Sequence, residues 1–238
     1  MNKHEDMSFD KAVIGGTSTM PIDPFDEAIF WSRPGLSRHN RHIAATMAAI
    51  MQRMEAPIER AVSRAVDEGF PAKALTEICV HSMLYAGTVT SEMSLHIAKV
   101  VLDSRGIAIQ VDPLPSVVTD EHRRKGAEIK AALHGERREV GHANPHARFA
   151  PALYQIATDI GYGHIWARGG LSLQERLICA IAAFTVQEDA EASFCKFAQA
   201  GQEHGLSVVE IQEVVIQTTP YVGFPRALKA LILMEDLF

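Results

Sequence analysis

The sequence predicts an all-α fold, and three observations support this prediction. Apolar residues recur with helical spacing along most of the chain, helix-capping patterns precede several of these stretches, and β-strand patterns are scarce. The exception is a short alternation at residues 107–111, which fits an extended linker. The 238 residues are 47% hydrophobic, enough for a buried core, so wholesale disorder is excluded.

The first long helix is expected to begin after Ser37, which suits the N-cap position. Its apolar residues fall at i, i+4, i+7, i+8 and i+11 and form one stripe: Ile43, Met47, Ile50, Met51 and Met54. Further along, Gly69 is placed to end a helix in the left-handed conformation. In the middle of the chain, residues 121–133 and 148–161 are amphipathic and predict two helices, with a loop at 134–145 between them.

The last third of the chain carries the clearest helix boundaries. Capping boxes begin at Ser172 and Ser207, each with a glutamate three residues later. A helix over 191–203 lies between them, and Gly205 is placed to end it. Pro220 and Pro225 flank a predicted break between helices, and the last helix runs to about residue 236.

One motif occurs twice. Residues 31–37 (Trp-Ser-Arg-Pro-Gly-Leu-Ser) and 166–172 (Trp-Ala-Arg-Gly-Gly-Leu-Ser) are similar at an offset of 135. The similarity continues at this offset with the pair Arg41/Arg176. After a slip of one residue the offset is 136, and four further pairs match: Gly69/Gly205, Glu77/Glu213, Tyr85/Tyr221 and Gly87/Gly223. We therefore predict two copies of one helical unit, at residues 25–105 and 151–238, joined by a helix-containing linker at 106–150.

Composition excludes several classes of protein. The net charge of −6 argues against nucleic-acid binding. The three cysteines (Cys79, Cys179 and Cys195) contain no Cys-x-x-Cys pair, which argues against a disulfide framework or a zinc module and is typical of reduced cytoplasmic thiols. We find no apolar run of about 18 residues and no signal-peptide core, so we expect a cytoplasmic protein without membrane contact.

Metals and cofactors are not expected. His142 and His146 are four residues apart, but Pro145 makes a helix that would bring them together doubtful.

Several segments together resemble the carboxymuconolactone decarboxylase family. The main segments are residues 165–177, 205–217 and 221–228. Residues 123–136 resemble the segment that precedes this motif in single-copy members. Residues 30–90 match the family more loosely. The resemblance implies an all-α bundle that assembles into homo-oligomers, and a trimer of this tandem chain would resemble a hexamer of single units. It also implies decarboxylation of a carboxylated lactone, or peroxide reduction in the related alkylhydroperoxidase-like branch. Such a decarboxylation needs no cofactor, because the conjugated carbonyl accepts the electrons as CO2 leaves. The protein must hold the carboxylate, stabilise the enolate oxygen and deliver a proton.

The chain departs from the family pattern at the positions that carry chemistry. The histidine that the family commonly places eight residues before the Gly of Gly-Leu-Ser is replaced by Phe197, and by Ala61 in the first copy. The cysteines of the redox branch would fall near Ala190 and Ser193. Peroxide reduction by the family route is therefore not expected, since it needs a thiolate beside a resolving thiol.

His81 and Tyr85 are the first candidates for replacing the missing catalytic group. They lie at i and i+4, so they share one face of a helix. The equivalent residues of the second copy are Gln217, a candidate substrate ligand, and Tyr221, a further catalytic candidate. The difference between the copies favours one active half. The alternative is a structural hydrogen-bonded pair at the helix break.

Arginines are the candidates for holding a substrate carboxylate. Arg41 and Arg176 open the long helix of each copy, and they either bind the substrate or bridge to a buried glutamate, Glu77 or Glu213, and lock the bundle. Arg226 follows the Gly-Phe-Pro turn and is a further candidate. Trp166 is the last substrate-binding candidate, with packing as its alternative.

Cys195 and His204 are two more polar candidates in the second copy. Nine residues separate them, about 900° of helical rotation, so on an unbroken helix they face opposite sides and form no dyad. A packed thiol and a helix-capping histidine are the alternatives.

The sequence thus favours a decarboxylase-like enzyme that acts without a cofactor on a small carboxylated lactone or a related unsaturated or polyketide-like acid, by decarboxylation or isomerisation. A non-catalytic ligand-binding or scaffold protein and a peroxidase-like redox protein are the alternatives.

Overall fold

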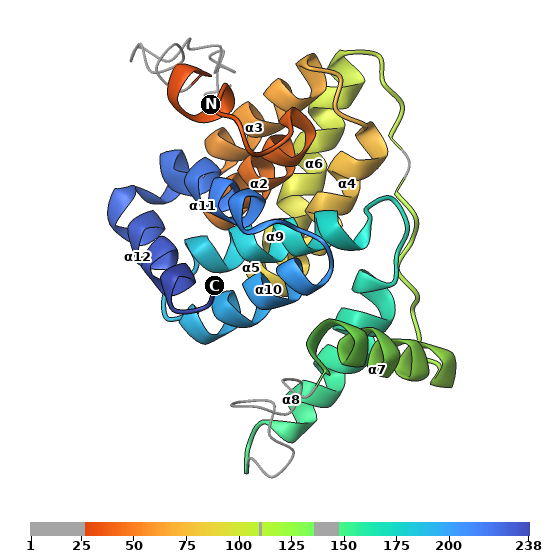
Figure 1. Cartoon of the computed structure of the whole chain (residues 1–238). Coiled ribbons are helices and arrows are strands. Elements are labelled where there is room, and N and C mark those ends of the chain that lie inside the picture. Colours follow the sequence, from red (N-terminus) through yellow and green to blue (C-terminus); the bar gives the residue numbers. More distant parts are fainter. Residues whose placement is uncertain (1–26, 110, 136–147) are drawn as a thin grey trace, which may run out of the picture. The chain divides into compact units, whose positions relative to one another are not determined.

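The computed structural model describes residues 27–109, 111–135 and 148–238 (Figure 1). These residues form helices and contain no β-strand, which confirms the all-α prediction. The chain divides into two compact units, residues 1–33 and 34–238. In the first, the described part holds the π-helix η1 (Glu27–Trp31), followed by a bond from the N–H of Ser32 to the carbonyl of Glu27 (3.0 Å). His142 and His146 lie outside the described residues.

The second unit begins with five helices: α2 (Arg38–Met51), α3 (Glu55–Asp67), α4 (Ala72–His81), α5 (Met83–Ala86) and α6 (Thr88–Ser104). The middle of the chain forms α7 (Asp120–His134), α8 (Pro151–Ile156) and the π-helix η4 (Ala157–Trp166). Four helices complete it: α9 (Leu173–Val186), α10 (Glu191–Glu203), α11 (Val208–Val222) and α12 (Phe224–Glu235). The first and last groups present equivalent helices in the same order, 135 or 136 residues apart, with α4 and α5 together corresponding to α11.

The predicted helix boundaries are largely confirmed. The hydroxyl groups of Ser37, Ser172 and Ser207 accept backbone N–H bonds at the starts of α2, α9 and α11, and the last two form complete capping boxes. Gly69 and Gly205 follow α3 and α10 with φ of +76° and +96°.

Two boundaries differ in detail from the prediction. The break predicted between Pro220 and Pro225 is confirmed at Gly223, where φ is +78°, but Pro220 itself lies inside α11, which continues to Val222. Proline removes one N–H bond, but the left-handed glycine is what ends this helix. The helix predicted at 148–161 is a short α-helix followed by a π-helix that continues to Trp166.

Glycines set the packing of α7 against η4. A Cβ atom added to Gly126 would lie 2.2 Å from the carbonyl oxygen of Thr158, and one added to Gly163 would lie 2.3 Å from that of His122. Both approaches are shorter than any side chain tolerates, so the two backbones meet where only glycine fits.

The two groups of helices share one hydrophobic core. Helix α2 packs against α9, α11 also packs against α2, and α4 packs against α9. Both α2 and α9 contribute small, fully buried side chains to this core: Ala44, Ala48, Ala180 and Ala183. None of the described helices is long and apolar enough to cross a bilayer.

Candidate functional site

Two buried arginines join the first group of helices to the last in a reciprocal way. Arg41 on α2 donates to Glu213 (2.9 Å) and to Oε1 of Gln217 (3.0 Å) on α11. Arg176 on α9 donates to Nδ1 of His81 on α4 (3.2 Å), and its guanidinium group lies 3.6 Å from Glu77. This is the bundle-locking alternative of the sequence analysis.

Backbone carbonyls complete the surroundings of these guanidinium groups. Arg176 donates to the carbonyl oxygens of Arg168 (2.8 Å) and Gly169 (3.2 Å), and Arg168 itself forms a two-pronged pair with Glu77 at 2.7 and 2.9 Å. Buried charges with such partners are costly to separate. A substrate carboxylate would therefore have to displace protein ligands to reach Arg41 or Arg176.

The predicted pair of His81 and Tyr85 is brought together by the helix break between α4 and α5. Nε2 of His81 lies 3.2 Å from the hydroxyl oxygen of Tyr85. Since a guanidinium group has only donors, Nδ1 of His81 accepts from Arg176, and we infer that the neutral ring carries its proton on Nε2. That proton is donated to Tyr85, which leaves the Tyr85 O–H proton available for a ligand.

Both groups of this pair are electrically neutral at physiological pH. Burial, followed by the charge of Arg176, lowers the pKa of His81 well below its usual value. Burial raises the pKa of Tyr85 well above its usual value. The pair is therefore suited to donate hydrogen bonds to a developing anion and not to act as a base.

A second histidine–tyrosine pair lies next to the first. Nε2 of His134, at the end of α7, is 2.9 Å from the hydroxyl oxygen of Tyr162 in η4, and burial raises the pKa of Tyr162. Tyr162 also contributes to raising the pKa of Tyr85, so the two phenols are close enough to interact. The sequence analysis missed this pair, because its members come together only through the packing of α7 on η4.

Aromatic rings enclose the two pairs. Trp166 contacts His81 edge-on with ring centres 5.0 Å apart and stacks on Tyr162 and Phe197. Phe197 also contacts His134 at 4.9 Å. Trp166 and Phe197 are buried, whereas Tyr85 and Tyr162 are only half-buried, so the phenols are the more accessible part of the cluster.

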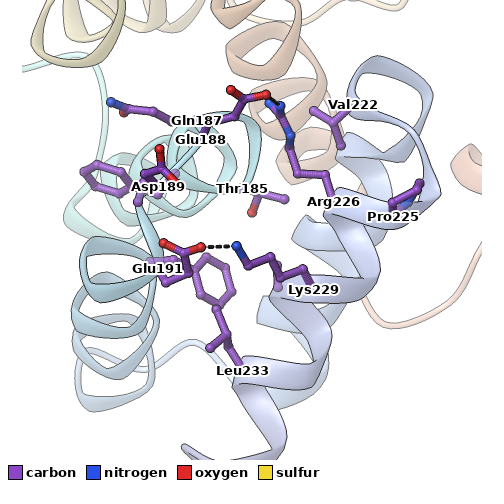
Figure 2. Close-up of a pocket in the computed structure, with 14 residues that line it drawn as sticks. Thr185, Gln187, Glu188, Asp189, Glu191, Val222, Pro225, Arg226, Lys229 and Leu233 are labelled. Carbon is purple, nitrogen blue, oxygen red and sulfur yellow. Dashed lines mark hydrogen bonds and ion pairs between the residues drawn. The ribbon is translucent and has the colours of Figure 1, made fainter.

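A cavity of about 480 Å³ opens beside this cluster (Figure 2). Arg226 and Lys229 project into it from α12 and form ion pairs with Glu188 and Glu191. Phe184 lines the cavity and also packs edge-on against Tyr85, with ring centres 5.3 Å apart. The lining does not include His81 or Tyr85, so Phe184 forms the wall between the cavity and the phenols.

The remaining predicted residues lie elsewhere. Helix α10 is unbroken from 191 to 203, so Cys195 and His204 lie on different sides of it. Burial raises the pKa of the half-buried Cys195 thiol, and Nε2 of His204 contacts the carbonyl oxygen of Ala132 at 3.1 Å. Tyr221 is half-buried at the end of α11 and does not line the cavity.

Comparison with known proteins finds a family match for residues 151–236. Residues 151–236 match the model of the carboxymuconolactone decarboxylase family. A segment of 78 residues is 32% identical to 4-carboxymuconolactone decarboxylase of Acinetobacter baylyi; it covers 33% of this chain and 58% of that protein. The segment from α8 to α12, which supplies Tyr162, Trp166, Arg176 and Arg226, is therefore similar to this family of decarboxylases.

Proposed function

We propose that the protein is a carboxymuconolactone decarboxylase-like enzyme that acts without a cofactor on a small carboxylated lactone or a related unsaturated or polyketide-like acid. The observation that carries this proposal is the pair of neighbouring phenols, each hydrogen-bonded to a buried imidazole. Such an arrangement offers preorganised donors to an oxyanion without a metal.

The chemistry assigned to these groups is simple. The bond between the substrate carbon and its carboxylate breaks, CO2 leaves, and the electron pair moves into the conjugated carbonyl to form an enolate. Tyr85 donates a hydrogen bond to the enolate oxygen, while Nε2–H of His81 holds the phenol in place. We propose that Tyr162 delivers the proton that forms the new C–H bond, and that His134 positions the Tyr162 hydroxyl group through their hydrogen bond.

Arg226 is the proposed ligand of the substrate carboxylate. Its present partner, Glu188, has a side chain that is 76% exposed. An exposed ion pair contributes little stability, so a substrate carboxylate can replace Glu188 at low cost. Phe184 separates this cavity from Tyr85, so the proposal requires the Phe184 ring to turn aside when a substrate binds, which lets the enolate oxygen reach the Tyr85 hydroxyl group.

We also propose that the chain is a fusion of two copies of the family unit and forms a homo-oligomer, a trimer by analogy with a hexamer of single units. The equivalent helices and the reciprocal arginine contacts support the duplication. The first copy has His81 where the second has Gln217, so we propose that the first copy, which contains His81 and Tyr85, is the active half.

The test is turnover of candidate lactones, 4-carboxymuconolactone first, followed by CO2 release and loss of the substrate. Tyr85→Phe removes one hydroxyl that donates to the enolate and should lower kcat by about 10²- to 10³-fold. Tyr154→Phe removes a half-buried phenol of α8 and should leave kcat unchanged. Equal activity of the two variants would refute the assignment.

A non-catalytic ligand-binding role is the alternative favoured by the replacement of the family histidine with Phe197 and Ala61. It predicts a rise in melting temperature with these lactones and no CO2 release.

A further inference from the structure

A second cavity, of about 310 Å³, has a lining that includes neither Tyr85 nor Tyr162. Residues that precede α7, the first turns of α7 and the end of η4 form its wall: Asp112, Pro113, His122, Lys125, His164 and Arg168 among them. Its volume is at the lower end of the range, about 300–1,000 Å³, of small-molecule sites.

His164 is the unusual residue of this wall. Its side chain is buried, with 7% of the residue exposed, and its Nε2 has no hydrogen-bond partner among the residues that the structure describes. A buried polar atom without a partner costs free energy, and such atoms are rare in native structures. Because this atom is closed to water, a ligand in the cavity would become its partner only after the His164 ring turns toward the ligand.

His122 adds a donor of known direction. Its Nδ1 accepts the backbone N–H of Thr119 (3.1 Å) in the capping box of α7, so the neutral ring carries its proton on Nε2. The rings of His122 and His164 lie 4.0 Å apart. Both imidazoles line the same small cavity.

The charges of the wall are compatible with an anion, because neither of its carboxylates is both buried and unpaired. The carboxylate of Asp112 is paired with Lys73 (2.5 Å), and the guanidinium group of Arg168 is paired with Glu77 (2.7 Å). Within the described parts of the chain, Lys125 has no ion pair, so it contributes a free ammonium group beside the imidazoles. Glu121 is the remaining carboxylate of the wall, and it is exposed to water.

We propose that this cavity binds a small anion, a carboxylate or a phosphate, through Lys125, His122 and His164. The site is separate from the cavity of Arg226, and the proposal does not depend on the decarboxylase function. Lys125 supplies the charge, Nε2–H of His122 donates, and the His164 ring turns so that its buried Nε2 gains the anion as a partner.

Isothermal titration calorimetry of the full chain with inorganic phosphate and, separately, with succinate tests this proposal at constant ionic strength. At least one anion should bind saturably, and Lys125→Gln should weaken that binding about tenfold, the loss of one charge-assisted hydrogen bond. Arg124→Gln is the matched control, because Arg124 precedes Lys125 on α7, is exposed and does not line the cavity.

Histidine-selective NMR of the same samples locates the anion. The ring signals of His122 and His164 should shift on binding, while those of the exposed His96 should not. Absence of saturable binding by both anions, or equal weakening by the two α7 variants, would overturn the proposal. So would anion-dependent shifts that leave His122 and His164 unchanged.

Discussion

The guanidinium group of Arg41 lies 2.9 Å from the carboxylate of Glu213, which is 172 residues further along the chain, and both side chains are buried. The contact joins α2 to α11 across the shared core. Removing one member leaves the other charged and buried, which is far more costly than losing an exposed pair.

We expect Glu213→Ala to lower the free energy of unfolding by about 3–5 kcal/mol. Urea denaturation measures this loss. Asp103→Ala, which breaks the exposed Lys99–Asp103 pair of α6, is the control and should cost less than about 0.5 kcal/mol. The double variant Arg41→Met, Glu213→Ala should lose less than the sum of its single variants, because neither charge is then left alone. Simple additivity would contradict the importance of the pair.

The neutral state of His81 predicts a dependence of stability on pH. Below about 6.5 the unfolded chain takes up a proton at this residue and the folded chain does not, because the folded pKa is lowered. The contribution of His81 is therefore complete above that pH and decreases as the pH falls toward the lowered pKa, by up to about 1.4 kcal/mol per pH unit.

His81→Gln provides the comparison, because glutamine already occupies the equivalent position, where Gln217 accepts from Arg41. Denaturation between pH 7.5 and pH 5.5 should show a shallower loss of stability for this variant than for the parent chain. The lowered pKa values of His42 and His164 act in the same direction in both proteins and do not affect the comparison. Parallel curves would show that His81 takes up a proton in the folded state.

The close contact between α7 and η4 predicts a strong effect of one methyl group. Gly163→Ala places a Cβ atom 2.3 Å from the carbonyl oxygen of His122, so the two helices must separate, at a cost of about 1–3 kcal/mol. Gly169→Ala is the matched control, since no atom lies within 4 Å of its added Cβ. Melting temperatures measured by circular dichroism should fall for the first variant only.

The three thiols should differ sharply in reactivity. Cys79 and Cys179 are buried, and burial raises the pKa of Cys79 to about 12, whereas Cys195 is half-buried. Titration of the native protein with a chromogenic disulfide should label Cys195 alone, and the other two should react only after unfolding. Cys195→Ser should abolish native labelling and leave any peroxide consumption unchanged. Loss of peroxide consumption in this variant would instead support the redox alternative.

Local patterns were sufficient to predict most helices. The serines at 37, 172 and 207 and the glycines at 69 and 205 act at short range, and each has the predicted cap or left-handed conformation. Pro220 shows the limit of such rules, because the helix continues through it to Gly223. The π-helix that ends at Trp166 was not predicted, because the apolar spacing in this region was interpreted as that of an ordinary α-helix.

Some features of the candidate site also followed from the sequence, and others depended on the tertiary structure. His81 and Tyr85 are four residues apart at a helix break, so the sequence alone determined that they share a face. It also determined that Cys195 and His204 do not, and that the arginines at 41 and 176 face either a ligand or a glutamate. Tertiary structure decided between these alternatives in favour of the buried glutamates, because α2 packs on α11 and α9 on α4. It also brought His134 to Tyr162 and to Phe197, from segments whose spacing carries no local signal. Contacts within one helix follow from periodicity, whereas contacts between distant helices depend on which surfaces are buried together.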